Sequence, residues 1–337
     1  MKKLLTIVIP SYNVEKYLTQ TLDSFVIEKQ WMEKLEILIV DDGSKDNTAA
    51  IGKEYETKYP GVYRVISKEN GGHGSTINRG ILEGQGKYFK VVDGDDWVDS
   101  QGFGNFLKLL NECDSDLVIT DYYEVSDKTK EKTAKEFTEI QCNRALKLEE
   151  VIEKVQIPMH ALTIKTEILQ TNKIKMDEHR FYVDVEYILY PIPYVKNIMY
   201  FKEYVYMYRL AVATQSVSMA GYQKHMQDHI DVVMNLAKYL ALYIKKEENQ
   251  KKNKVRIDYM CTRIAQMAKD QIDIFMSFPV KEKGIREKFI EFDRNLKKVN
   301  PQVYLQAGTY SGMLRMLRKL KYRGYYLIMY MSKKKNK

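Results

Sequence analysis

The chain has 337 residues, 45% of them hydrophobic and 29% charged, with a net charge of +9. This length predicts about two domains, with a core large enough to need no disulfides. No apolar stretch reaches the ~20 residues that a membrane-spanning helix needs. The three cysteines have neither disulfide nor metal-site spacing, which favours a reducing cytoplasm: Cys113, Cys142 and Cys261.

The N-terminal segment, MKKLLTIVIPSYN, resembles the start of a signal peptide, with two lysines followed by an apolar run. The run stops at Pro10 without a small-residue cleavage site, so we interpret residues 4–9 as a first strand. Because this run is continuously apolar, it predicts a strand that is buried on both faces, as in a parallel sheet.

Strands and helices alternate along the first hundred residues. Further strands are predicted at residues 35–40, 62–66 and 87–92, and helices at 15–27, at 47–59 and after residue 74. This alternation predicts an α/β fold with a largely parallel sheet. Such sheets bind ligands outside the carboxyl ends of their strands. Four polar loops fall at those ends, at residues 10–13, 41–44, 70–74 and 93–96.

The last of these loops carries three carboxylates within four residues, in the order Asp93, Gly94, Asp95 and Asp96. Clustered carboxylates repel one another, and burying them is costly unless a cation is present. Oxygen ligands without histidine or cysteine suit Mg²⁺ or Mn²⁺, which usually bridge carboxylates to substrate phosphates. The alternative is a solvated acidic turn that follows a strand.

The other loops also allow a purely structural interpretation, because DDG at residues 41–43 and NGG at residues 70–72 are ordinary turn sequences. Neither a GxGxxG nor a GxxxxGK[ST] motif is present, which argues against dinucleotide and P-loop sites. Four polar loops at one edge of a sheet are still stronger evidence for a ligand site than any one of them.

Four segments in order carry a resemblance to a known family: IVIPSYNVEKYL, EILIVDDGSKDNT, KENGGHGSTINRGI and GKYFKVVDGDDW. In order and spacing they resemble family 2 glycosyltransferases. The resemblance is close over about the first 100 residues, weaker to about residue 218, and absent beyond. It implies a GT-A fold with a nucleotide-sugar-binding α/β domain. It also implies sugar transfer with inversion at the anomeric carbon and a divalent metal.

This resemblance implies that the first two loops form a nucleotide pocket. Pro10, Tyr12 and Glu15 would shape the pocket. Asp41, with Asp42 beside it, would accept a hydrogen bond from the base, which favours uracil and therefore a UDP-sugar.

The resemblance places the diphosphate and the metal at the acidic loop. Asp93, Gly94 and Asp95 would flank the ribose and diphosphate. Asp95 or Asp96 would bind the metal, because the four-residue DGDD leaves two registers open. Asn70, in the Gly-rich loop, is expected to line the same nucleotide-sugar site.

The Gly-rich segment departs from the family pattern at two points. Asn78 matches the asparagine of the family's usual A-R-N segment, but Ile77 stands where arginine is common, and Arg79 follows. His73 is the second departure. We expect Arg79 or His73 to supply the missing positive contact to the diphosphate. The alternative is that neither does, and that His73 is a turn residue.

Two further acids follow the aromatic residues Phe181 and Tyr182. The family has a general base at this point, usually in an E-D pair before an aromatic helix. Asp184 is the match, with Val183 in the usual glutamate position. Transfer needs one carboxylate opposite the leaving diphosphate to accept the proton of the acceptor hydroxyl. The alternatives are that Glu186 is the base, or that Asp184 only caps a helix.

The segment YRLAVATQSVS resembles the family's sequence near the end of this domain, and implies that Arg209, Gln215 and Ser216 lie near diphosphate or acceptor. After it the pattern changes to helical apolar periodicity. We therefore expect a glycosyltransferase domain over residues 1–219 and a helical domain over residues 220–337.

The C-terminal end combines an apolar stripe with positive charge. Residues 301–337 contain nine lysines and arginines and no acid, so the first 300 residues are neutral overall. The stripe has helical spacing, and a basic amphipathic segment fits binding to an anionic membrane surface. The alternative is a last helix packed on the body with a solvated lysine tail. The stripe consists of Tyr310, Met313, Leu314, Leu317 and Leu320.

These features predict a cytoplasmic, metal-dependent, inverting glycosyltransferase, peripheral on the inner face of the cell membrane. The expected donor is a UDP-sugar, and the expected acceptor is a glycan or lipid-linked acceptor in cell-surface polysaccharide synthesis. Nucleic acid is not an expected partner, because no basic face accompanies the acidic half. A nucleotidyltransferase of related fold is a rival, but PSYNVEKY lacks a basic loop to grip a triphosphate. A non-catalytic scaffold is the second rival, opposed by the intact acids.

Overall fold

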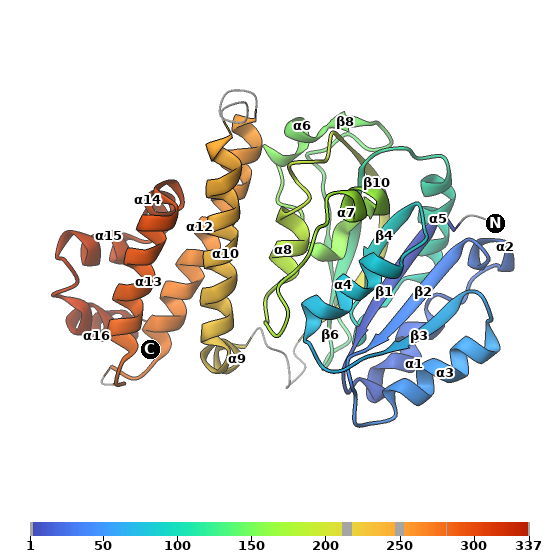
Figure 1. Ribbon diagram of the computed structural model, residues 1–337, viewed down its shortest axis with the longest axis horizontal. Coiled ribbons are helices and arrows are strands. Elements are labelled where there is room, and N and C mark those ends of the chain that lie inside the picture. Colours follow the sequence, from blue (N-terminus) through green and yellow to red (C-terminus); the bar gives the residue numbers. More distant parts are fainter. Residues whose placement is uncertain (1–2, 211–217, 247–252, 281, 336–337) are drawn as a thin grey trace. The chain divides into compact units, whose positions relative to one another are not determined.

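The computed structural model describes residues 3–210, 218–246, 253–280 and 282–335, without the side chains of residues 332–335 (Figure 1). The chain divides into two compact units, residues 1–213 and 214–337. This division lies slightly before the expected boundary after residue 219. Two residues expected near the diphosphate or acceptor, Gln215 and Ser216, lie outside the described residues.

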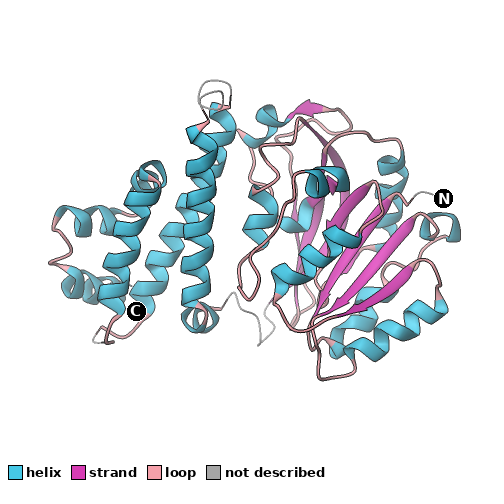
Figure 2. Ribbon diagram, in the orientation of Figure 1, coloured by secondary structure: helices cyan, strands magenta, loops and turns pink. Residues whose placement is uncertain are grey.

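The first unit is built on a ten-stranded sheet, with strand order β3-β2-β1-β4-β9-β6-β10-β5, in which β7 pairs with β6 and β8 with β10 (Figures 1 and 2). Strands β1 to β4 pair in parallel, as do β6 and β10, whereas β9 is antiparallel to both β4 and β6. The strands are β1 (Leu5–Ser11), β2 (Leu35–Asp41), β3 (Tyr63–Ser67), β4 (Tyr88–Val91), β5 (Trp97–Val98), β6 (Leu117–Ser126), β7 (Lys132–Lys135), β8 (Leu146–Lys147), β9 (Leu162–Lys165) and β10 (Asn197–Leu210).

Helices cover both faces of this sheet. Ile7 and Ile9 of β1 pack in one core with residues of α1 and α5, whereas Val8 faces α4. A Cβ atom on Gly80 would lie only 2.2 Å from Cγ2 of Val8, so α4 can approach β1 this closely only with glycine there. The helices are α1 (Glu15–Asp23), α2 (Lys29–Met32), α3 (Thr48–Lys58), α4 (His73–Glu83), α5 (Ser100–Asn111), α6 (Leu148–Ile152), the 3₁₀ helix η1 (Met159–Ala161), α7 (Thr166–Thr171) and α8 (Asp184–Leu189).

The expected α/β class is confirmed, and its physical basis is visible in the central strands. Every residue of β1 and of β2 is buried, as continuous apolar runs predict for strands covered on both faces. The carboxyl ends of β1, β2, β3 and β4 meet at one edge of the sheet because these strands are parallel. This edge carries the four polar loops.

The described part of the second unit consists of helices joined by turns and contains no strand (Figure 2). Among the described residues, no helix combines the length and apolarity needed to cross a bilayer. The helices are α9 (Met219–Lys224), α10 (Met226–Lys245), α12 (Lys254–Ser277), α13 (Ile285–Val299), α14 (Pro301–Tyr310), α15 (Gly312–Lys319) and α16 (Tyr325–Lys335).

The predicted apolar stripe of the tail is divided between core and surface. Leu314 and Leu317 of α15 are fully buried, whereas Tyr310 and Leu320 are 40% and 46% exposed. Arg318 is also largely buried, and its guanidinium forms a bidentate pair with the buried carboxylate of Asp293, with a shortest N···O distance of 2.6 Å. This part of the tail is therefore a component of the helical core.

Replacing Tyr322 by phenylalanine should destabilise the helical unit by about 1.5–3 kcal/mol, the usual range for a hydrogen bond to a charged group. The Tyr322 hydroxyl donates to Oδ2 of Asp293 at 2.8 Å, so its loss leaves a buried carboxylate with one donor fewer. Urea denaturation followed by circular dichroism measures the change. Tyr326→Phe is the matched control, because Tyr326 is 49% exposed. Equal stability of the two variants would contradict this account of the Asp293 cluster.

Candidate active site

The acidic loop after β4 is held against the end of β1. The N–H of Gly94 donates to the carbonyl oxygen of Pro10 at 3.1 Å, and a Cβ atom on Gly94 would lie 2.9 Å from that oxygen. The hydroxyl of Thr21 donates to the carbonyl oxygen of Asp96 at 2.5 Å. Tyr206, from β10, accepts the N–H of Asp93 at 3.2 Å. The loop that carries the carboxylates is therefore fixed by its backbone, as a preorganised ligand site requires.

Asp93 forms a close pair with His73, the first residue of α4. Oδ1 of Asp93 lies 2.7 Å from Nε2 of His73, and both side chains are partly exposed. Burial alone would lower the pKa of His73, but the charge and hydrogen bond of Asp93, with smaller contributions from Asp184 and Asp95, raise it. The pKa of Asp93 is lowered, because the effect of His73 exceeds that of burial. The acidic cluster therefore favours the protonated form of the His73 imidazole.

Asp95 and Asp96 differ in their surroundings, although they are neighbours in sequence. Both carboxylate oxygens of Asp96 are occupied, because Tyr206 donates its hydroxyl to Oδ2 at 2.6 Å and Arg209 donates its N–H to Oδ1 at 2.7 Å. Burial and the charges of Asp95 and Asp93 raise the pKa of Asp96. Asp95 is partly exposed, and burial together with Asp93 raises its pKa to about 6.

Arg209, which was expected near diphosphate or acceptor, supports the backbone of the acidic loop. Its Nε–H donates to the carbonyl oxygen of Asp95 at 2.6 Å, and its other nitrogens donate to Asp127 at 2.9 Å and to Gln20 at 2.8 Å. Its guanidinium also lies 4.6 Å from the centroid of the Trp97 ring, within cation–π range. The Arg209 side chain is only 5% exposed, so its guanidinium interacts with protein groups rather than with solvent.

Asp42 shapes the Gly-rich loop. Its Oδ1 accepts hydrogen bonds from Lys68 Nζ at 2.6 Å and from the N–H of Gly71 at 2.9 Å, and its Oδ2 accepts from the N–H of Gly72 at 2.8 Å. The expected nucleotide contact Asn70 is exposed, and its amide donates to the carbonyl oxygen of Asp42 at 3.0 Å. Both oxygens of the Asp42 carboxylate thus accept hydrogen bonds from within the protein.

The residues expected at the nucleotide pocket lie at the carboxyl ends of β1 and β2. Tyr12 is 48% exposed beside Pro10. Asp41 is buried, with Oδ1 accepting the N–H of Ser44 at 3.0 Å. Glu15 is exposed, and its Oε2 accepts two hydrogen bonds, each 2.9 Å long, from the backbone and side-chain amides of Asn47. Glu15 therefore joins the first loop to the start of α3.

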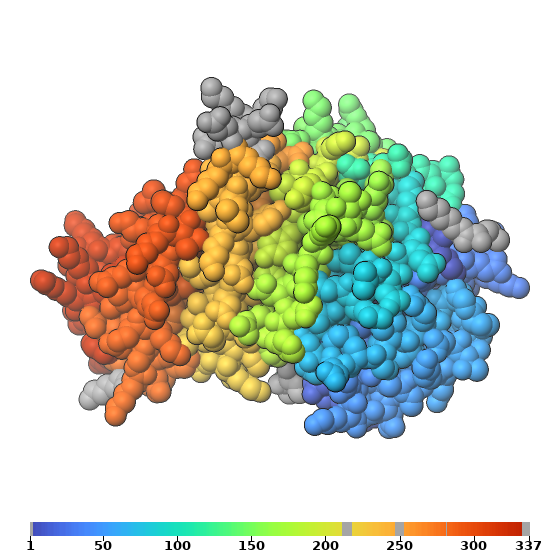
Figure 3. All heavy atoms as spheres, in the orientation of Figure 1, coloured from blue at the N-terminus to red at the C-terminus, as the bar shows by residue number. Residues whose placement is uncertain are grey.

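The segment 173–183 is hydrogen-bonded to α4, and in Figure 3 yellow-green atoms border light-blue ones on this face. Asn78, which was expected at the nucleotide-sugar, forms hydrogen bonds to this segment: its amide donates to Met176 O at 2.9 Å and its Oδ1 accepts Met176 N–H at 2.8 Å. Gly74 also permits the contact, since a Cβ atom there would lie 2.1 Å from the carbonyl oxygen of Asp177. Arg79 is exposed and pairs with Glu83, one turn further from the acidic loop.

Asp184 is brought to the same cluster by this segment. It is partly buried at the start of α8, and its charge acts on the pKa of His73, which places its carboxylate within electrostatic range of the Asp93 pair. Tyr182, two residues earlier, has φ +68, an uncommon backbone conformation for a residue other than glycine. Such conformations persist where surrounding structure enforces them, often at active sites.

Glu186, the alternative base, is turned into the protein. It is fully buried, with Oε2 accepting the N–H of Asp177 at 2.7 Å and Oε1 accepting the hydroxyl of Tyr190 at 3.1 Å. Burial raises its pKa to about 7. Both oxygens thus hold the segment that carries Asp184, which favours a structural role.

The oxygen donors of this cluster are of the type that a divalent metal takes, and Asp95 is the carboxylate that could hold one. The described residues contain no group of three or more side chains placed to hold an ion by themselves. Mg²⁺ sites often use only one or two carboxylates together with substrate phosphates and water. Asp95 is partly exposed, and the charge of Asp93 acts on it. Its carboxylate therefore suits such a shared site better than the carboxylate of Asp96, whose two oxygens already accept hydrogen bonds from the protein.

The sequence interpretation missed four residues beside the acidic loop, three of which come from the later strand β10 and a short 3₁₀ helix. Tyr206 holds Asp96. Lys90 is fully buried and donates to the carbonyl oxygen of His160 at 2.8 Å, and burial lowers its pKa to about 7. His160 stacks on Tyr208, with ring centroids 4.0 Å apart. Lys90, a charged residue within the apolar strand before the DGDD motif, was the one sequence feature that could have indicated polar partners here.

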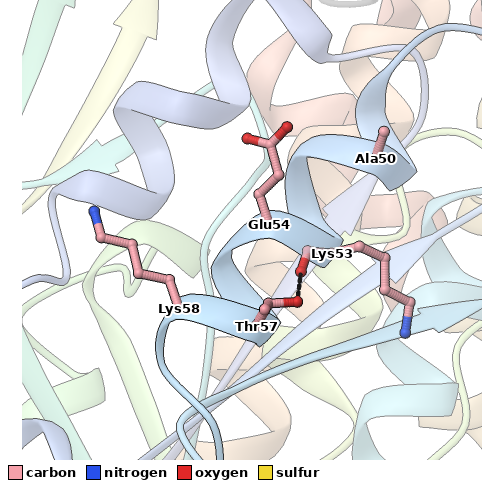
Figure 4. Close-up of a pocket in the computed structure, with 5 residues that line it drawn as sticks. All are labelled: Ala50, Lys53, Glu54, Thr57 and Lys58. Atoms are coloured by element: carbon pink, nitrogen blue, oxygen red, sulfur yellow. Dashed lines mark hydrogen bonds between the residues drawn. The ribbon is translucent and has the colours of Figure 1, made fainter.

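A separate surface hollow lies on α3 (Figure 4). Its lining residues are all exposed and belong to one helix, in which Thr57 Oγ1 donates to the carbonyl oxygen of Lys53 at 2.9 Å. No strand-end loop contributes to it, so it is not part of the acidic site. The residues that line the hollow are Ala50, Lys53, Glu54, Thr57 and Lys58.

The sheet order and the loops at its edge define a GT-A type fold. S. aureus TarS 1–349 in complex with UDP-GlcNAc has a similar fold, with a TM-score of 0.67 and 16% identity over 98% of this chain and 92% of that one. The mannosyltransferase PcManGT from Pyrobaculum calidifontis, in complex with GDP-Man and Mn²⁺, aligns with a TM-score of 0.52 and 12% identity over 98% of this chain and 87% of that one.

Residues 6–172 match the family described as Glycosyl transferase family 2, and the chain belongs to this family. It is 34% identical over 114 residues to the minor teichoic acid biosynthesis protein GgaB of Bacillus subtilis, an alignment that covers 34% of this chain and only 13% of GgaB. It is 27% identical over 239 residues to the uncharacterized glycosyltransferase EpsJ of the same organism, covering 68% of this chain and 67% of EpsJ.

Proposed function

We propose that the chain transfers a sugar from a UDP-sugar to a hydroxyl group of a glycan or lipid-linked acceptor, with inversion and with a divalent metal. The observation that carries this proposal is the convergence of Asp93, Asp95, His73 and Asp184 at the carboxyl edge of the sheet. The similarity to a teichoic acid biosynthesis protein supports an acceptor in surface-polysaccharide synthesis.

The donor nucleotide is proposed to lie across the ends of β1 and β2. Tyr12 is exposed there and offers an aromatic face, and Asp41 offers a carboxylate to the N–H of a uracil ring. The TarS structures in complex with UDP-GlcNAc and with UDP support this choice of base. Asp42 and Asn70 shape the Gly-rich loop next to this pocket and thereby position His73.

The chemistry proposed for Asp184 is general-base catalysis. Its carboxylate takes the proton from the acceptor hydroxyl, whose oxygen forms a bond to the anomeric carbon as the bond from that carbon to the diphosphate breaks. The electron pair leaves on the diphosphate. His73, whose pKa is raised by Asp93, would when protonated place a positive charge next to Asp93, where the departing diphosphate is expected. When bound at Asp95, Mg²⁺ or Mn²⁺ supplies Lewis-acid stabilisation of that leaving group.

A screen of nucleotide-sugars, with UDP release measured with and without acceptors, tests this function. We expect metal-dependent UDP release from at least one UDP-sugar, faster with a suitable glycan. A nucleotidyltransferase would instead release pyrophosphate from a nucleoside triphosphate. A scaffold would bind UDP without turnover, and either result would reject the proposal.

We also propose that the second unit holds the enzyme at the inner face of an anionic membrane. Helix α15, the turn after it and α16 carry exposed apolar and basic side chains, which suits an interfacial segment. The exposed apolar residues are Met316, Leu320, Tyr326, Leu327, Tyr330 and Met331, and the exposed basic residues are Arg315, Lys319, Lys321 and Arg323.

Replacing Leu327 and Met331 together by serine should reduce binding to anionic vesicles without unfolding the unit. These side chains are 66% and 55% exposed, so they contribute little to the core, whereas deletion of the whole tail would remove its buried residues. Vesicle flotation at two salt concentrations measures the effect. Salt screens the attraction between basic residues and anionic lipids over ~8 Å at physiological ionic strength, so binding through charge should weaken as salt rises. The control is Leu242→Ser, which changes a leucine that is 63% exposed on α10. Unchanged, salt-independent flotation of all three proteins would contradict a membrane role.

A further inference from the structure

Three aromatic side chains line the site beside the acidic loop, and we call them the aromatic wall. They are Tyr122 of β6, His160 of η1 and Tyr208 of β10. The His160 and Tyr208 rings stack with centroids 4.0 Å apart and an interplanar angle of 25°, and the Tyr122 ring lies 5.6 Å from that of His160. All three are partly exposed, so their rings are not simply core residues.

The sheet order places this wall on the far side of the acidic loop from the proposed nucleotide pocket. Along the sheet, β2 and β1 carry the nucleotide pocket, β4 carries the acidic loop, and β9, β6 and β10 follow. Tyr206 joins the wall to the loop, because its ring lies 4.8 Å from that of His160 and its hydroxyl holds Asp96. Tyr208 follows two residues later on the same face of the strand, one step nearer to the site.

The polar groups of the wall point to a hydroxylated ligand. Burial and the charges of the site carboxylates raise the pKa of the Tyr208 phenol, so this hydroxyl stays protonated and can donate a hydrogen bond. Burial lowers the pKa of His160 to about 4, so the imidazole is neutral at neutral pH. The carboxylates that act on the phenol are Asp96, Asp93, Asp184 and Asp95.

We propose that the aromatic wall is the binding subsite for the sugar ring of the acceptor. The apolar face of a sugar ring would pack on the His160–Tyr208 stack, and the Tyr208 hydroxyl would donate to a sugar hydroxyl. This inference rests on the proposed function, because Asp184, the proposed base for the acceptor, is one of the carboxylates whose charge acts on the Tyr208 phenol. A ring held here would lie beyond the diphosphate, where the attacking hydroxyl must be.

Saturation-transfer NMR tests the subsite with simple probes: methyl glycosides of glucose, galactose and N-acetylglucosamine, each in the presence of UDP and Mn²⁺. We expect signals from at least one glycoside with the parent protein. Tyr208→Phe, which keeps the stack but removes one hydroxyl, should weaken binding roughly tenfold, and Tyr208→Leu should abolish it. The matched control is Tyr123→Leu, because Tyr123 stacks on Tyr204, at 4.3 Å, on the other side of β6.

Titration of UDP and of UDP-GlcNAc into each protein separates the possible outcomes. If the parent binds UDP but no methyl glycoside, or if Tyr123→Leu loses the glycoside as fully as Tyr208→Leu does, the subsite is rejected and the proposed function stands. If Tyr208→Leu keeps the glycoside but loses affinity for UDP-GlcNAc relative to UDP, the wall holds the donor sugar and the acceptor assignment is overturned. A parent that binds glycosides but not UDP would reject the UDP-sugar donor and leave the subsite in place.

Discussion

Replacing Asp184 by asparagine should lower the rate of sugar transfer by about 10²–10⁴-fold, the usual contribution of a general base. The amide has nearly the shape of the carboxylate but cannot take the acceptor proton. Fold and donor binding should remain, because Asp184 is only partly buried and asparagine keeps its size and shape. UDP release with acceptor measures the rate, and titration calorimetry with UDP and Mn²⁺ measures donor affinity.

Glu186→Gln provides the control for that experiment. Its carboxylate accepts the Asp177 N–H and the Tyr190 hydroxyl, so the amide should disturb the segment before α8 and lower stability more than it lowers chemistry. If Asp184→Asn kept near-parent turnover while Glu186→Gln was folded but inactive, Glu186 would be the general base and Asp184 would not. Thermal melting of both variants distinguishes loss of chemistry from loss of fold.

The central part of the fold was predictable because its signals are local. The apolar runs of β1 and β2 and the polar residues that end them are each contained in a few consecutive residues. Strand β9 was not predicted, since LTIK is only four residues long and its place between β4 and β6 depends on partners distant in sequence. Strand β10 was also missed, although its many tyrosines and alternating burial are typical of a strand.

The site was predictable to the level of motifs but not of individual contacts. DGDD and NGGHG identify the loops, yet the sequence leaves open whether Arg79 or His73 faces the acids. The structure pairs His73 with Asp93 and turns Arg79 toward Glu83, because successive positions of α4 point in different directions around the helix. The partners of Asp96, Tyr206 and Arg209, lie more than 100 residues away along the chain, beyond any local pattern.

The different surroundings of Asp95 and Asp96 lead to opposite expectations for the metal. Asp96 has both oxygens bound by protein donors, and an asparagine there can keep the Arg209 N–H bond and donate to the Tyr206 hydroxyl. Asp96→Asn should therefore retain metal-dependent UDP binding. Asp95 lies at the open side of the loop, beside the charge of Asp93. A single ion could therefore bind both the Asp95 carboxylate and the diphosphate.

Asp95→Asn should remove most of the effect of Mn²⁺ on UDP affinity, because the metal contributes several kcal/mol of charge stabilisation at such sites and each 1.4 kcal/mol is a factor of ten. We expect UDP to bind about a hundredfold more weakly with Mn²⁺ than it binds to the parent, and no differently without it. Calorimetric titrations of UDP with and without Mn²⁺, on the parent and on both asparagine variants, measure this. The opposite result, in which Asp96→Asn loses the metal dependence and Asp95→Asn keeps it, would contradict this assignment. The ion would then bind Asp96, and the Tyr206 hydroxyl would have to leave the Asp96 carboxylate when donor and metal bind.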